Sequence, residues 1–155
     1  MNPKNAWSRT LDILAHRAQS EARLKKKLVL LGVAHEEAEE AAIKARRLKL
    51  LDDASYARML AERELRLGRG PLRIRAALLA HGISDPQIRE ALSALDLDQS
   101  EQVLNLAQAA LKKKSAKNPG MAGMKAFGYL LRQGYGPAIA RKAAQTTIEL
   151  EGENE

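Results

Sequence analysis

The sequence predicts an all-α protein, built as a tandem array of three three-helix repeats. Ala, Leu, Arg, Lys and Glu, which lose little free energy on entering a helix, dominate the 155-residue chain, whereas Val and Ile are sparse. No segment alternates apolar and polar residues for long enough to predict a β-strand. One helix pattern also returns about every 50 residues, a period typical of helical repeat proteins.

Start and stop signals divide the chain into nine predicted helices. Ser20 and Asp52 are each placed to cap a helix, and Ser84 with Gln87 has the spacing of a capping box. Three prolines stand where a helix can begin, because a missing backbone N–H is tolerated in the first turn. They are Pro71, Pro119 and Pro137. The predicted helices cover residues 6–18, 21–31, 35–48, 53–67, 71–81, 85–94, 99–114, 119–133 and 137–149.

A recurring pattern predicts how these helices are grouped. In each copy, two apolar positions four residues apart are followed by a glycine and a further apolar residue. The copies are Leu24, Leu28, Gly32 and Val33; Ile74, Leu78, Gly82 and Ile83; and Ala126, Leu130, Gly134 and Tyr135. Because each glycine ends an apolar periodic run, we expect it to end its helix or to adopt a positive φ. The expected repeats are residues 6–51, 52–97 and 98–150, followed by an acidic tail at 151–155, in an elongated or curved array.

Charge and composition limit the classes of partner and environment. The chain has 26 Lys and Arg against 19 Asp and Glu, and this net charge of +7 favours polyanions or an acidic protein surface. The absence of cysteine excludes disulfides and thiolate zinc sites. No apolar run approaches the roughly 20 residues that span a bilayer, and the N-terminus lacks the apolar stretch of a secretory signal. We therefore expect a cytoplasmic protein with no membrane partner.

The sequence contains no recognisable catalytic or metal-binding motif. There is no phosphate-binding loop, no dinucleotide fingerprint and no serine in a known nucleophile setting. His16, His35 and His81 lie in different repeats, each without a second ligand at helical spacing. We expect no catalytic residues, no metal and no cofactor, and therefore a protein that is not an enzyme.

Basic residues form the candidate binding site for a partner protein or DNA. Five arginines fall within thirteen residues around the turn at residues 68–71, and arginine favours two-pronged contacts with phosphate or carboxylate. The candidate residues are Arg23, Lys26, Lys27, Arg63, Arg66, Arg69, Arg73, Arg75, Lys112, Lys113 and Lys114. The alternative is a solvated face that binds nothing. We expect Arg66, Arg69 and Arg73 to reach the partner and to contribute little to folding, as exposed side chains usually do.

Two long motifs in the first two repeats resemble those of a known family. They are Leu11-x-x-Leu14-Ala15-x-Arg17-x-x-Ser20-x-x-x-Leu24-x-x-Lys27-Leu28-x-x-x-Gly32, and Leu50-Leu51-Asp52-Asp53-x-x-Tyr56-Ala57 with Arg63 and Gly68-Arg69-Gly70-Pro71-x-x-Ile74-Arg75-x-x-Leu78-x-x-x-Gly82-Ile83. Over residues 7–95 the sequence resembles the RecX family, and the likeness is looser beyond about residue 100. The resemblance implies tandem three-helix repeats in a cytoplasmic bacterial regulator, without catalytic residues. It also implies a protein that binds RecA, free or as its filament on single-stranded DNA, and inhibits its ATPase, strand-exchange and coprotease activities. Such an activity belongs to DNA repair, recombination and the SOS response.

Two other classes of function stay open at this point. The chain could be a general nucleic-acid-binding repeat protein without a recombinase partner, which a steep salt dependence of DNA binding would reveal. It could also be an enzyme with an unrecognised site. For the RecA regulator we expect a monomer that binds single-stranded DNA weakly or through RecA. Capping, groove insertion and disassembly of the filament are equally compatible with the sequence.

Overall fold

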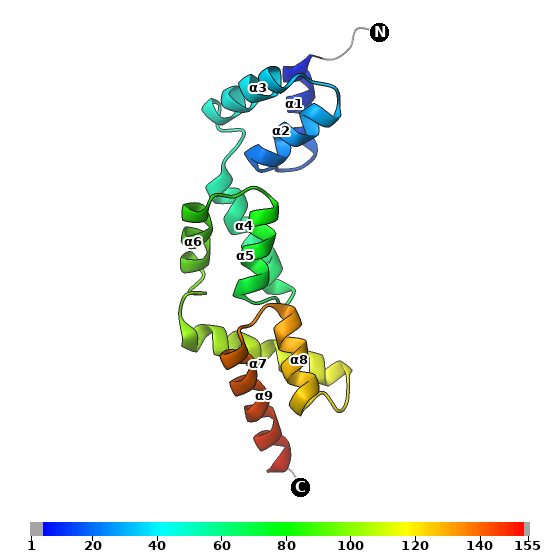
Figure 1. Cartoon of the computed structure of the whole chain (residues 1–155), viewed down its shortest axis with the longest axis vertical. Helices are drawn as coiled ribbons and strands as arrows, with labels where there is room; N and C mark the ends of the chain where they lie inside the picture. The colour runs from blue at the N-terminus through cyan, green and yellow to red at the C-terminus, as the bar shows by residue number, and fades with distance from the viewer. Residues whose placement is uncertain (1–4, 154–155) are drawn as a thin grey trace.

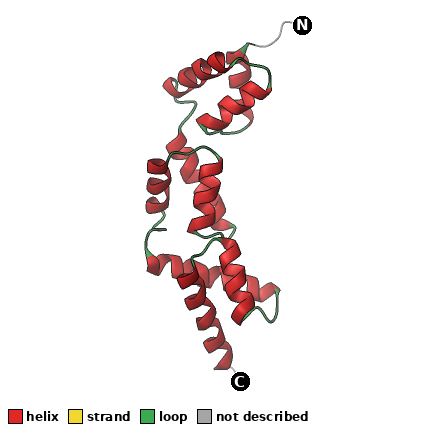
Figure 2. Cartoon of the chain, viewed as in Figure 1, coloured by secondary structure: helices red, strands yellow, loops and turns green. Residues whose placement is uncertain are grey.

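The computed structural model describes residues 5–153, and the regular structure in this range is entirely α-helical. The helices of the described residues are α1 (Ala6–His16), α2 (Glu21–Leu30), α3 (His35–Arg47), α4 (Asp53–Arg66), α5 (Pro71–Ala80), α6 (Asp85–Ala94), α7 (Ser100–Lys117), α8 (Gly123–Gln133) and α9 (Pro137–Gly152). Figure 2 shows helices joined by short loops, with no strand in the part of the chain that is described. The predicted all-α fold is confirmed. No helix in the described range is both long and apolar enough to cross a membrane.

Consecutive helices pack in threes and form three bundles along the long axis of the molecule (Figure 1). We call them the N-terminal bundle (α1–α3), the central bundle (α4–α6) and the C-terminal bundle (α7–α9). Each bundle buries an apolar cluster of its own, because each helix has one apolar stripe to remove from water. The clusters contain, in order, Leu24 and Leu28, Ile74 and Leu78, and Ala126 and Leu130. The repeat boundaries at residues 52 and 98 stay a prediction.

The three recurring glycines stop the middle helix of each bundle in the same way. Gly32, Gly82 and Gly134 have φ values of +90°, +76° and +98°, so the expected left-handed conformation is confirmed. The N–H after each glycine donates to the carbonyl five residues earlier, as from Val33 to Leu28 at 3.0 Å. This hydrogen bond is part of the Schellman motif, which pairs carbonyls that the helix end leaves free.

The middle helices α2, α5 and α8 follow one another along the long axis and point in the same direction (Figure 1). At the first junction, the C-terminal end of α5 meets the N-terminal end of α2, where the Ser20 hydroxyl donates to the His81 carbonyl. At the second junction, the C-terminal end of α8 meets the N-terminal end of α5, where the Gly70 N–H donates to the Gln133 carbonyl at 2.7 Å. We call this series of three helices the column.

One predicted helix start and one predicted cap are wrong. The helix expected from residue 119 begins at Gly123, because the chain first turns at Gly120, which has a φ of +87°. Ser84 does not form the expected capping box, since its hydroxyl donates to the Gln87 side chain at 3.0 Å and caps no backbone N–H.

The last helix is longer than the sequence predicts. It reaches Gly152 and so includes the start of the expected acidic tail at 151–155. Residues 154 and 155 of that tail lie outside the described residues.

Candidate cationic interface

A cavity of about 480 Å³ lies beside the first junction, between the N-terminal and central bundles. We call it the first cleft. Its fixed charges are all positive and come from both bundles: Arg17, Arg23, Lys27, Arg63 and Arg66. Within the described residues none of these five side chains forms an ion pair with a carboxylate. A surface of this kind favours an anionic partner that touches both bundles at once.

The spacing of the sequence places these cations beside the buried core. Arg23 and Lys27 are four residues apart on α2, and each directly precedes a buried leucine of the N-terminal cluster. They therefore share one face of the helix, next to its apolar stripe. Arg63 and Arg66 belong to the last turn of α4, where positive charge interacts favourably with the helix dipole.

His81 lines the first cleft, and the positive charge of the cleft affects its pKa. Its ring Nδ1 shares a hydrogen bond of 2.6 Å with the Tyr56 hydroxyl. Burial lowers the pKa of His81 below its usual value, and the positive charges of Arg23 and Arg63 lower this pKa further. The cleft therefore favours a neutral imidazole and leaves the surrounding arginines available to an anion.

A second cavity, of about 420 Å³, lies beside the second junction. We call it the second cleft. Its fixed charges are again all positive within the described chain: Arg66, Lys113, Lys114 and Lys117. Tyr129 also lines it, with the Lys114 Nζ 5.4 Å from the centre of its ring, a distance typical of cation–π contacts. Because Arg66 lines both clefts, the cations form one path from the N-terminal to the C-terminal bundle across the end of α4.

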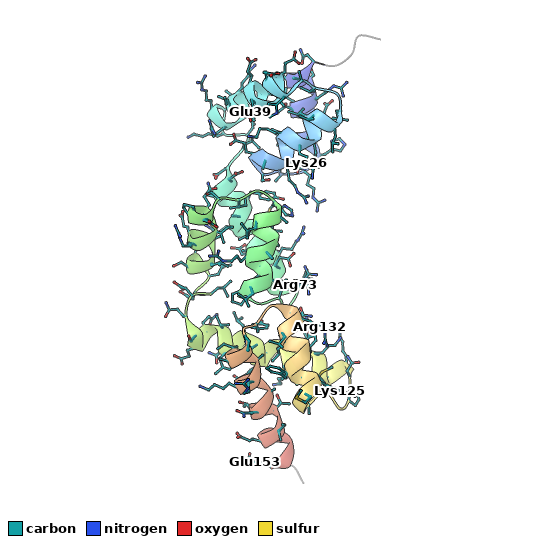
Figure 3. All side chains as sticks on the ribbon, viewed as in Figure 1. Lys26, Glu39, Arg73, Lys125, Arg132 and Glu153 are labelled. Carbon is teal, nitrogen blue, oxygen red and sulfur yellow. The ribbon has the colours of Figure 1, made fainter. Side chains whose placement is uncertain are left out.

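The structure brings most of the sequence-predicted basic residues together in these clefts. Arg23, Lys27, Arg63 and Arg66 meet in the first cleft, and Lys113 and Lys114 join Arg66 in the second. Lys26, labelled in Figure 3, lines a neighbouring hollow together with Arg23 and Lys27. Lys112 is exposed and lines neither cleft.

The remaining three arginines make contacts within the molecule. Arg69 forms an ion pair with Glu64, whose side chain is only 7% exposed. The Arg73 guanidinium donates to the Arg132 carbonyl at 3.3 Å, where α5 and α8 meet (Figure 3).

Arg75 lies 4.0 Å from Asp85 in a partly exposed pair. The expectation that Arg69 and Arg73 are free to reach a partner is therefore corrected: Arg69 pairs with a buried carboxylate of its own bundle, and Arg73 contacts α8 across the second junction.

Sequence reasoning did not include the cations Arg17 and Lys117 or the aromatic Tyr129 of the two clefts among its candidates. Arg17 follows α1 as an isolated arginine, and only the packing of two bundles brings it to the others. Lys117 extends the lysine run on α7 by one turn, so the helical period could have identified it. Tyr129 gave no signal beyond being one of few aromatic residues. Among the described residues, no group of three or more potential ligands is placed to hold a metal ion.

Stacked three-helix bundles crossed by a path of cations define a helical repeat protein with an extended binding surface. The family model described as RecX, second three-helix domain, matches residues 52–92. The regulatory protein RecX of Stenotrophomonas maltophilia (strain R551-3) is 28% identical over 137 residues, which cover 88% of this chain and 83% of that protein. This chain is similar to RecX proteins along most of its length, and its central bundle matches the second three-helix domain of that family.

Solved structures agree with this assignment. A crystal structure of regulatory protein RecX superposes with a TM-score of 0.70 at 27% identity, covering 86% of this chain and 67% of that one. RecX from Lactobacillus salivarius superposes with a TM-score of 0.73 at 19% identity, covering 91% of this chain and 93% of that one. The second likeness supports the helical repeat fold alone.

Proposed function

We propose that this protein is a cytoplasmic regulator that binds RecA and its filament on single-stranded DNA. It modulates, and mainly inhibits, the ATPase, strand-exchange and coprotease activities of that filament. Similarity to regulatory proteins named RecX supports the class of partner. The cationic path through Arg66 supports the mode of binding, since it offers a long surface to a long polyanionic partner.

The two clefts suit a nucleoprotein partner because each combines charges from two bundles. An anion in the first cleft contacts Arg23 and Lys27 on one side and Arg63 on the other. Arginine can hold a phosphate or a carboxylate with two parallel hydrogen bonds, so the cleft accepts DNA phosphates and acidic protein side chains alike.

The direct test measures RecA ATPase on single-stranded DNA while this protein is added at substoichiometric and stoichiometric ratios. We expect inhibition that is strongest at low salt, because exposed charges are screened as ionic strength rises. Unchanged ATPase at saturating amounts, with RecA from the same organism, contradicts the proposed function.

A charge-matched pair of variants tests the site itself. R63Q/R66Q removes two cations from the clefts, whereas R47Q/R89Q removes two exposed arginines that line neither cleft and have no partner within the described residues. We expect R63Q/R66Q to weaken binding to the RecA filament at least tenfold, since one charge-assisted hydrogen bond contributes about 1.5–3 kcal/mol. The control should bind like the parent, and circular dichroism should show both variants folded. Equal losses in the two variants would mean that net charge alone governs binding.

A second candidate function is binding to nucleic acid without a recombinase. Cations beside Tyr129 favour it, because a phosphate path next to an aromatic ring is typical of single-strand binding. A dominant DNA binder should hold single-stranded DNA tightly by itself, with a steep fall in affinity as salt increases. Weak binding to bare DNA and tight binding to the filament favour the RecA regulator.

A further inference from the structure

The column of middle helices has two ends that no other bundle covers. A Cβ placed at Gly82 would lie 2.3 Å from the Ala22 Cβ, and one placed at Gly134 would lie 2.4 Å from the Arg73 Cβ. A Cβ placed at Gly32 or Gly123 would have no neighbour within 4 Å in the described structure. The C-terminal end of α2 and the N-terminal end of α8 are thus open, whereas the equivalent ends at the two junctions are occupied.

Both open ends carry strongly exposed apolar side chains. Met124, in the first turn of α8, is 82% exposed, and Leu30, in the last turn of α2, is 76% exposed. These are the highest exposures among the large apolar side chains of the described residues. Single exposed apolar residues are common on protein surfaces. Here, however, the two most exposed apolar side chains lie at the two open ends of one column.

The occupied ends differ from the open end at equivalent positions. Counting back from the terminal glycine, Leu30 and Leu31 correspond to Ala80 and His81 and to Arg132 and Gln133. The covered ends therefore carry small or polar residues, and the open end carries two leucines. Terminal repeats of helical arrays normally present a polar outer face, so an apolar end indicates a partner.

The other open end contains a groove that suits an apolar side chain. A cavity of about 420 Å³ lies between α8 and α9 and begins at the first turn of α8. Met124, Phe127, Ala144 and Ile148 form most of its apolar lining, with Ile148 51% exposed.

The charges near the two open ends are complementary. Exposed Glu36 and Glu37 follow the Gly32 turn in the first turn of α3, whereas exposed Lys117 and Lys125 flank the start of α8. The negative C-terminal end of one helix dipole would also meet the positive N-terminal end of another, as at both junctions.

We propose that copies of this chain associate head to tail, with the C-terminal end of α2 in one copy docked on the start of α8 in the next. Leu30 then enters the groove beside Met124, and the column continues from copy to copy in the way that it continues between bundles. The Leu31 carbonyl already accepts a hydrogen bond from Arg9 at 3.2 Å, so apolar side chains and complementary charges supply the attraction.

The proposed contact is weak because its interface is small. Two helix ends and one groove form a much smaller interface than the roughly 1,600 Å² of a stable complex. The chain is then a monomer at low concentration, as the sequence predicts. It associates only at high concentration or when a partner holds several copies in a row.

Sedimentation of the whole 155-residue chain alone, between about 0.01 and 1 mM, tests this proposal without RecA. The parent should gain average mass as its concentration rises. L30E and M124E should each remain monomeric, and an equal mixture of the two should form dimers and stop there, because one intact contact is restored. L48E, which changes a similarly exposed leucine away from both ends, should associate like the parent.

Three outcomes overturn the proposal. A parent that stays monomeric throughout the range excludes the contact, and a mixture of L30E and M124E that stays monomeric excludes the head-to-tail arrangement. Loss of association in L30E but not in M124E points to a symmetric contact between two α2 ends. If M124E does not fold, I148E changes the other wall of the same groove and takes its place.

Discussion

The two junctions join the same helix ends with different chemistry. At the first junction, side chains make the contacts: the Ser20 hydroxyl donates to the His81 carbonyl, and the Asp53 carboxylate accepts from the Glu21 N–H at 2.9 Å. At the second junction, backbone meets backbone, and the Leu72 N–H donates to the Gly134 carbonyl at 3.0 Å. Backbone contacts require closer approach, and Gly70 permits it, because a Cβ at this position would lie 2.7 Å from the Gly134 carbonyl oxygen. The equivalent position at the first junction is Ser20.

The apolar clusters of neighbouring bundles are likewise more closely connected at the second junction than at the first. Leu106 packs against the clusters of both the central and the C-terminal bundle, whereas the N-terminal and central clusters share no residue in the described chain. Buried Tyr135 donates from its hydroxyl to the Gly68 carbonyl at 3.3 Å, and burial raises the pKa of Tyr135 to about 12, so it stays a donor.

The central and C-terminal bundles thus form one cohesive unit. We expect the first junction to be the more compliant of the two, because no apolar cluster continues across it in the described chain. Since the first cleft lies at this junction, we expect its width to change when the junction opens or closes.

The largest expected loss of stability comes from adding a side chain at Gly134, where the second junction leaves no room for a Cβ. G134A places a Cβ against the Arg73 backbone and forces a non-glycine residue to a φ of +98°. We expect a loss of about 2–5 kcal/mol in the free energy of unfolding, from left-handed strain and overpacking together. Chemical denaturation followed by circular dichroism measures it.

G32A is the matched control, since it carries the same left-handed strain at an open end. Its loss should be only about 1–2 kcal/mol, with G82A between the two. Equal losses for all three variants would show that the junctions add nothing to the cost.

The next largest expected loss of stability concerns the ion pair between Arg69 and the buried Glu64 within the central bundle. R69A leaves the buried Glu64 carboxylate without its partner, and we expect a loss of about 2 kcal/mol in the free energy of unfolding. The double variant E64Q/R69A should recover much of this loss, because a neutral side chain needs no counter-charge. R58A, which breaks the exposed pair with Glu90, should cost at most about 1 kcal/mol. No recovery in the double variant would mean that Arg69 acts through packing alone.

The smallest effect is a pH dependence at the first junction. The folded state lowers the pKa of His81, so the unfolded chain binds the proton more readily as pH falls. This contribution to stability is fully present above the unfolded value near 6.5 and declines as pH falls towards the folded value. Denaturation of the parent and of H81N from about pH 8 to 5 should show a smaller decline in the variant. An anion in the first cleft should raise the pKa of His81 in an NMR titration, and an unchanged pKa would place the anion elsewhere.

Local signals in the sequence determined the helices and their grouping. Gly32, Gly82 and Gly134 end their helices because a positive φ after an apolar run is a property of a few neighbouring residues. The same signals failed at Pro119, where proline permits a helix start but does not require one, and the turn at Gly120 delays it.

The sequence alone also identified the basic segments. It did not show which of their residues line the clefts and which make contacts within the molecule. Spacing within a helix placed Arg23 beside Lys27 and Arg63 near Arg66, because the helical period fixes such neighbours. Only the tertiary structure brought Arg17 to them, and only it paired Arg69 with buried Glu64 and placed Arg73 against α8. These contacts depend on how one bundle docks on the next, and docking is set by helix ends that lie about 60 residues apart in the chain.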